Sequence, residues 1–175
     1  GDVVTETLSV TSWDGSATQT ITVEVKGSND FATIAVVPGG DNNVTEAGDG
    51  NGTVLATAGD ASAGGQLTVH DVDDGEAHFA TPASLAGTYG TFTFNPTTGV
   101  WGYTLANGQT NVQELNAGDV VHDQLVVASF DGTASYTIDV TVTGTNDAAT
   151  ITASASEDTA VTEVGDGNAT VLATA

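Results

Sequence analysis

Cysteine, methionine and basic residues are almost absent from this sequence of 175 residues. It has no cysteine and no methionine, and Lys26 is its single basic residue against 23 acidic ones, which gives a formal net charge of -22 at pH 7. Without cysteine the chain can form neither disulfides nor thiolate metal sites. Its strong negative charge argues against nucleic acid and anionic lipid as partners, because both carry charge of the same sign.

Long apolar runs and targeting signals are missing as well. No apolar run approaches the roughly 18 residues of a membrane span, and the sequence has no initiator methionine, signal peptide or lipidation motif. We therefore expect an internal piece of a longer soluble chain, with no direct membrane insertion.

The sequence instead contains a repeat with a period of 117 residues. Residues 1–30 align with 118–147 without a gap, and the match continues from 31–58 to 148–175, so that about 34 of the 58 overlapping positions are identical. We predict three parts: the C-terminal part of a preceding repeat (1–30), one complete repeat (31–147) and the N-terminal part of a following repeat (148–175).

Apolar residues alternate with polar ones in short runs separated by turn signals, which is typical of strands. One hairpin turns at Asp14-Gly15, its repeated copy turns at Asp131-Gly132, and another turns between 95 and 99. Further strands are expected at 32–37, 53–58 and 67–70, with a loop at 59–65 and a single helical turn at 112–115. The fold class that this pattern predicts is all-β, an antiparallel Ig-like or cadherin-like β-sandwich in tandem repeats.

Five motifs follow one another in the complete repeat: GGQLTVHDVDDGE from Gly64, GTYGTFTF from Gly87, GVWGYTL from Gly99, SFDGT from Ser129 and GTNDA from Gly144. This succession resembles the VCBS-type repeat, which occurs in long arrays in giant bacterial surface adhesins and related exported proteins, many of them released by type I secretion. The resemblance covers essentially the whole chain. It implies an extracellular or cell-surface location in a bacterium.

A more distant resemblance, to cadherin repeats, concerns calcium. An alternating strand that ends in an Asp-containing turn, followed by a strand and an Asn-Asp linker, is similar to the end of a cadherin repeat. Carried over, it implies calcium ligands at both ends of the complete repeat. At the leading end these are Asn29, Asp30, Asp71, Asp73 and Asp131, and at the trailing end Glu46, Asp119, Asn146 and Asp147. The cadherin Asp-Arg-Glu triplet is missing, so Asp119 and its equivalent Asp2 have no matching motif.

Calcium chemistry agrees with such a set, because Ca²⁺ takes about six to eight oxygen ligands from carboxylates, amides and backbone carbonyls. An EF-hand is excluded, since Gly75 falls at the fifth position of the loop that starts at Asp71 and Pro82 at the twelfth. The plainer interpretation is that residues 71–76 form a solvated acidic turn and that Asn146-Asp147 is only a linker. Zinc is not expected, because His70, His78 and His122 lack ligand spacing and a cysteine partner.

Catalytic motifs are missing: there is no phosphate-binding glycine loop and no Gly-x-Ser-x-Gly elbow. We therefore predict a non-enzymatic extender whose partners are neighbouring repeats of the same chain and whose joints are stiffened by calcium. One alternative is a filament in which copies complete one another's sheets by strand exchange. Another is a glycan-binding module around Tyr89, Trp101 and Tyr103, although core packing is the simpler role for such aromatic residues.

Overall fold

The computed structural model describes residues 1–154, 156 and 160, and the described part is all-β. The strands form a two-stranded sheet, a four-stranded sheet and a three-stranded sheet. Their bounds are β1 (Val3–Thr11), β2 (Thr18–Lys26), β3 (Thr33–Val36), β4 (Asn43–Thr45), β5 (Ser62–His70), β6 (Gly90–Phe94), β7 (Val100–Leu105), β8 (Val120–Ala128) and β9 (Ser135–Thr143), with one helical turn, α1 (Thr110–Gln113). The expected all-β class is thus confirmed.

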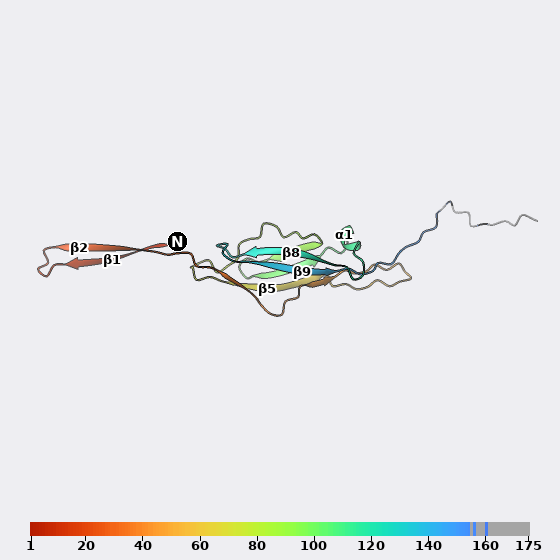
Figure 1. Cartoon of the computed structure of the whole chain (residues 1–175), viewed down its shortest axis with the longest axis horizontal. Coiled ribbons are helices and arrows are strands. Elements are labelled where there is room, and N and C mark those ends of the chain that lie inside the picture. Colours follow the sequence, from red (N-terminus) through yellow and green to blue (C-terminus); the bar gives the residue numbers. More distant parts are fainter. Residues whose placement is uncertain (155, 157–159, 161–175) are drawn as a thin grey trace, which may run out of the picture.

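The β1–β2 hairpin projects from one end of the molecule, and the chain beyond β9 leaves at the opposite end (Figure 1). Strands β1 and β2 pair from Val3 opposite Lys26 to Thr11 opposite Thr18. Alternation places apolar side chains on one face and mainly threonine and serine on the other. The apolar face consists of Val4, Leu8, Val10, Ile21, Val23 and Val25, all of them exposed.

The β8–β9 hairpin repeats this arrangement 117 positions later, from Val120 opposite Thr143 to Ala128 opposite Ser135. Here the same face is covered. Leu125, at the position equivalent to Leu8, is 5% exposed, whereas Leu8 is 61% exposed. One hairpin sequence pattern therefore occurs in the same molecule with and without a packing partner.

The packing partner of β8–β9 is the four-stranded sheet, in the order β3-β5-β7-β6. Buried residues of both sheets form one cluster, in which the rings of Phe92 and Tyr103 meet edge to face at 4.8 Å. The chain joins the sheets by crossing from β3, antiparallel to β5, to β4, parallel to β9. Trp101 and Tyr103 are buried, which confirms the simpler expectation that they pack in the core, and Phe92 is buried beside them.

A buried carboxylate connects the two sheets from β8. Asp123 is 3% exposed and accepts hydrogen bonds from the backbone N–H groups of Thr88 (2.7 Å), Tyr89 (2.9 Å) and Gly90 (3.1 Å). It also accepts one from the hydroxyl of Tyr103 at 2.7 Å. Four donors offset the cost of removing this charge from water.

Three expected elements are wrong in detail. Residues 53–58 form a bend and irregular backbone with a single bridge, Thr57 to Gly48, in place of a strand. Strand β5 begins at Ser62, inside the expected loop, because Gly64 and Gly65 pair with β7 in spite of their low strand propensity. The helical turn starts two residues early, at Thr110, and the three-residue strand β4 was not expected at all.

We expect the backbone amides of β1 and β2 to exchange with solvent much faster than those of β8 and β9, because an isolated two-stranded hairpin is at best marginally stable. Hydrogen exchange followed by mass spectrometry tests this, with the paired positions of the two hairpins as internal controls. Equal protection of the two hairpins would contradict it and would mean that another copy covers β1–β2 in solution.

Candidate metal centre

The loop after β5 carries the first part of the site. Asp71, directly after the strand, is 8% exposed, and its Oδ1 accepts a hydrogen bond from the N–H of Asp73 at 2.9 Å. Gly75 adopts a φ of 81°, a conformation that favours glycine, and thereby lets the chain turn back. This turn brings Glu76 alongside Asp71.

The turn between β8 and β9 supplies the second part. Oδ1 of Asp131 accepts hydrogen bonds from the Ser129 hydroxyl at 2.6 Å and from the N–H of Thr133 at 3.2 Å. These donors, Ser129 foremost, hold the pKa of Asp131 well below its ordinary value. Asp131 is therefore a fixed negative charge at this end of the complete repeat.

The two parts converge on one point. One carboxylate oxygen each from Asp71, Glu76 and Asp131 lies within 4.8 Å of the others. Two buried oxygens, Oδ2 of Asp71 and Oε2 of Glu76, have no hydrogen-bond partner among the described residues. Such unpartnered acceptors are costly unless something else satisfies them.

The charges at this point repel one another. Burial, followed by the charges of Asp73, Asp71 and Asp131, raises the pKa of Glu76. A bound cation would reverse the repulsion and satisfy the two buried oxygens. A donor set made only of oxygen fits Ca²⁺ or Mg²⁺ rather than zinc. The residues present therefore fit the expected calcium ion.

The linker after β2 is attached to the same cluster. Asn29 donates from Nδ2 to Oδ2 of Asp131 at 3.1 Å, and the N–H of Asp30 donates to Oδ2 of Asp73 at 2.7 Å. All five residues expected at the leading end thus lie together, although Asn29, Asp30 and Asp73 adjoin the three converging carboxylates rather than belong to them.

Glu76 is the member of the cluster that the expected ligand set lacked. Its nearness to Asp71 depends on the turn at Gly75, and the sequence signal for it is the Asp-Gly-Glu that closes the acidic loop.

The trailing end is organised differently. Glu46 is fully buried, with Oε2 accepting from the N–H of Thr145 at 3.0 Å and Oε1 from Nε2 of Gln113 at 3.2 Å. Burial above all, together with Asp147 and Asp49, raises its pKa. Oδ1 of Asp147 accepts from the N–H of Asp49 at 2.6 Å.

The remaining trailing-end residues do not complete a cluster of three carboxylates within the described part of the chain. The Asn146 side chain donates to the carbonyl oxygen of Asp147. Asp119 accepts from the side chain and the N–H of Asn116, which lower its pKa, so it caps a turn. No hydrogen bond among the described residues joins it to Glu46, Asn146 or Asp147.

The expected glycan-binding patch is wrong in its original place. Trp101 is 8% exposed and Tyr103 is 2% exposed, so with Tyr89 they present no open platform of rings. The histidines also stay outside any metal cluster of the described residues.

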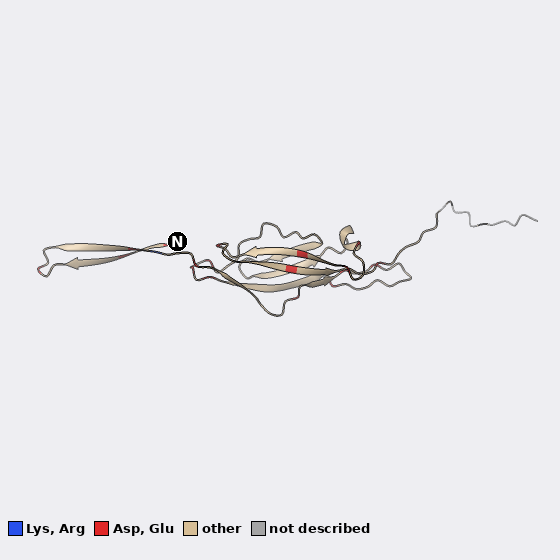
Figure 2. Ribbon diagram, in the orientation of Figure 1, with Lys and Arg blue, Asp and Glu red and all other residues tan. Residues whose placement is uncertain are grey.

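Acidic residues occur at the hairpin tip, at the joint after β2, on β8 and β9, and in the loops at the far end (Figure 2). No helix in the described residues is long and apolar enough to cross a membrane. Comparison with known proteins finds no matching family model and no matching curated protein.

Proposed function

We propose that the chain is a structural extender of a bacterial cell-surface adhesin that calcium stiffens at the joints between repeats, in support of cell adhesion or biofilm formation. In this proposal residues 31–147 are one Ig-like β-sandwich, and residues 1–30 and 148–175 belong to its neighbours. The observation that carries the proposal is the pair of buried, unpartnered oxygens of Asp71 and Glu76 beside Asp131, at the point where the linker enters.

Calcium would be held by Asp71, Glu76 and Asp131, with Asn29, Asp30 and Asp73 close enough to contribute from the linker and the loop. Such an ion would join the linker to two loops of the complete repeat and so restrict its orientation. The linker enters at one end and the chain leaves at the other, which suits repeats that run in line (Figure 1). Extracellular calcium modules bind at about 10⁻⁴ to 10⁻³ M, so the surrounding medium would set the stiffness.

Asp131→Asn is expected to weaken calcium binding about tenfold or more, because it removes one negative ligand and leaves the turn in place. Titration calorimetry measures the loss. For the wild type, small-angle scattering should show a stiff particle with calcium that loosens when excess chelator is added. For the Asp131→Asn variant, the same measurement should show no such change.

The matched control is Asp14→Asn at the equivalent turn of β1–β2. Oδ1 of Asp14 accepts from the Ser12 hydroxyl at 2.7 Å and from the N–H of Ser16 at 3.1 Å, but Asp14 belongs to no acidic cluster of the described residues. We expect this variant to bind calcium like the wild type. If the wild-type chain gives neither binding heat nor a change of shape with calcium, the acidic loops are solvated surface and the calcium joint is wrong.

A second candidate function is a filament that copies of the chain form by strand exchange. The exposed apolar face of β1–β2 favours it, since that face matches the covered face of β8–β9. Protection of β1–β2 that increases with protein concentration in the hydrogen-exchange experiment would support this candidate.

A further inference from the structure

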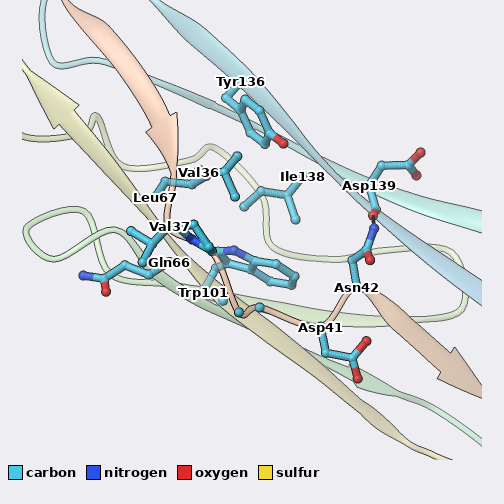
Figure 3. Close-up of a pocket in the computed structure, with 14 residues that line it drawn as sticks. Val36, Val37, Asp41, Asn42, Gln66, Leu67, Trp101, Tyr136, Ile138 and Asp139 are labelled. Atoms are coloured by element: carbon cyan, nitrogen blue, oxygen red, sulfur yellow. Dashed lines mark hydrogen bonds between the residues drawn. The ribbon is translucent and has the colours of Figure 1, made fainter.

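Two features of the complete repeat have no part in the proposed calcium joint. One is a pocket of about 240 Å³ between the two sheets, where the chain crosses from β3 to β4 (Figure 3). Apolar side chains, among them Trp101 and Ile138, form its walls, and it is smaller than the about 300–1,000 Å³ of typical ligand sites. The other is the loop at residues 47–58, which carries an asparagine followed by a glycine, Asn51-Gly52.

This loop holds the linker that leaves β9. The N–H of Asp49 donates to Oδ1 of Asp147 at 2.6 Å, and the N–H of Ala148 donates to the carbonyl oxygen of Asp49 at 2.9 Å. Nδ2 of Asn51 donates to the carbonyl oxygen of Ala149 at 2.7 Å. The Asn51 amide therefore helps to fix the direction in which the chain leaves the complete repeat.

The same asparagine is open to attack by its own backbone. Gly52 has no side chain to block the approach of its nitrogen to Cγ of Asn51. The N–H of Gly52 donates no hydrogen bond to any of the described residues, so this nitrogen is not held elsewhere. Both residues are exposed, and solvent base can therefore reach the Gly52 N–H.

Two backbone donors polarise the Asn51 amide. Its Oδ1 accepts hydrogen bonds from the N–H groups of Thr53 at 3.0 Å and Val54 at 2.9 Å. When a nitrogen adds to Cγ, negative charge develops on this oxygen, and two N–H groups at such distances stabilise it as an oxyanion hole does. The loop therefore lowers the barrier to ring closure at Asn51.

We propose that Asn51 is a site of spontaneous deamidation, which releases the linker from this loop. The Gly52 nitrogen loses its proton to solvent base and bonds to Cγ, while the bond from Cγ to Nδ2 breaks. Nδ2 takes up a proton from water and leaves as ammonia, so that a succinimide ring remains. Water then opens the ring at either carbonyl and gives aspartate or isoaspartate.

The product cannot hold the linker in the same way. A carboxylate has no hydrogen to donate to the carbonyl oxygen of Ala149, so the bond from residue 51 is lost. The new negative charge is also repelled by Asp49 and Asp147 close by. Deamidation therefore removes one contact of the linker and weakens the others.

Asn95 is a matched internal control, because it has the same donors but no attacking nitrogen. Its Oδ1 accepts from the N–H groups of Thr97 at 3.0 Å and Thr98 at 3.1 Å. The next residue is Pro96, whose nitrogen carries no proton to lose. Asn95 should therefore not convert by this route.

Asn107 is the other asparagine followed by a glycine in the sequence. It is half-buried, and among the described residues its Oδ1 accepts a single hydrogen bond, from the N–H of Ala47 at 2.8 Å. We expect Asn51 to convert at least about threefold faster than Asn107, because of its greater exposure and its second donor.

The test is incubation of the full chain at neutral and at mildly alkaline pH, with excess chelator throughout. Digestion after glutamate gives a peptide of residues 47–76, which contains Asn51, and one of residues 77–114, which contains Asn95 and Asn107. Mass spectrometry follows the exchange of the amide for a carboxyl group in each peptide. The rate at Asn51 should rise with pH, because the attacking nitrogen must first lose its proton.

Gly52→Ala should slow the conversion at least about tenfold, since the added Cβ atom hinders the approach of the nitrogen. The sequence itself contains this substitution, because residues 166–170, the copy of residues 49–53, read Asp-Gly-Asn-Ala-Thr. Conversion at Asn51 that is absent, or no faster than at Asn107, would overturn the modification site.

Asn51→Asp reproduces one product and tests the release of the linker. The Ala148 N–H, which is bonded to Asp49, should exchange about twofold to tenfold faster than in the wild type, because one supporting hydrogen bond is lost. Thr97→Asp adds the same charge in the turn between β6 and β7 and should leave this exchange unchanged. Unchanged exchange in Asn51→Asp would show that the amide does not hold the linker.

The importance of a released linker for an array of repeats rests on the proposed function. The chemistry at Asn51 does not, because both measurements are made with excess chelator and need no calcium. A chain that deamidates as expected but binds no calcium would disprove the calcium joint alone, and a chain that binds calcium without converting Asn51 would disprove the modification site alone.

Discussion

Asp123→Ala is expected to lower the free energy of unfolding of the complete repeat by at least about 4 kcal/mol. The substitution leaves three backbone N–H groups and the Tyr103 hydroxyl without their acceptor inside the protein. Each buried donor that loses its partner costs about 1–3 kcal/mol. A typical domain is stable by only about 5–15 kcal/mol, so we expect a measurable fraction of the Asp123→Ala molecules to be unfolded at room temperature.

Urea denaturation followed by circular dichroism measures the loss, and Glu6→Ala is the matched control. Glu6 occupies the equivalent position in β1–β2 and is exposed, so its removal should change stability by less than about 0.5 kcal/mol. Tyr103→Phe removes one of the four donors and should cost about 1 kcal/mol, which gives a measurable value even if Asp123→Ala does not fold. A loss below about 1 kcal/mol in Asp123→Ala would mean that the four bonds do not hold the sheets together.

Leu125→Ala is expected to cost about 2–5 kcal/mol, whereas Leu8→Ala should cost less than about 0.5 kcal/mol. The two leucines occupy equivalent positions in hairpins of the same length and register. Only the covering sheet differs, since Leu125 is 5% exposed and Leu8 is 61% exposed. The comparison therefore isolates the contribution of packing from that of the strand itself.

Thermal and urea unfolding of the two variants under identical conditions provide this measurement. The protein concentration should be varied, because association would stabilise the hairpin by mass action. A cost for Leu8→Ala as large as that for Leu125→Ala would show that β1–β2 is covered in solution, and it would favour the filament over the extender.

The hairpins could be predicted from sequence because their signals are local. Alternation and an Asp-Gly turn define β1–β2 and β8–β9, and the aromatic alternation of β7 identified the buried face of Trp101 and Tyr103. The five leading-end residues came from a resemblance to cadherin motifs, and the structure brings them together. In the hairpins and in β7 a few neighbouring residues carry the information.

Other features depend on contacts between segments distant in sequence. Strand β4 has only three residues and exists because β9 lies beside it. Gly64 and Gly65 indicate a loop by their propensity, yet they pair with β7. The role of Asp123 requires the turn at residues 88–90, about 35 positions earlier, and the pocket above Trp101 requires the crossing from β3 to β4. No local pattern contains these relations.

The parallel pairing of β4 with β9 determines how the complete repeat would respond to a pulling force. The chain enters just before β3 and leaves just after β9, so tension between the two ends pulls β4 and β9 in opposite directions along their length. Their backbone bonds, among them Thr141 N–H to the carbonyl of Asn42 and Glu46 N–H to that of Thr143, lie across this direction. They are loaded together in shear rather than opened one by one, and a strand pair of only three residues therefore becomes a mechanical clamp.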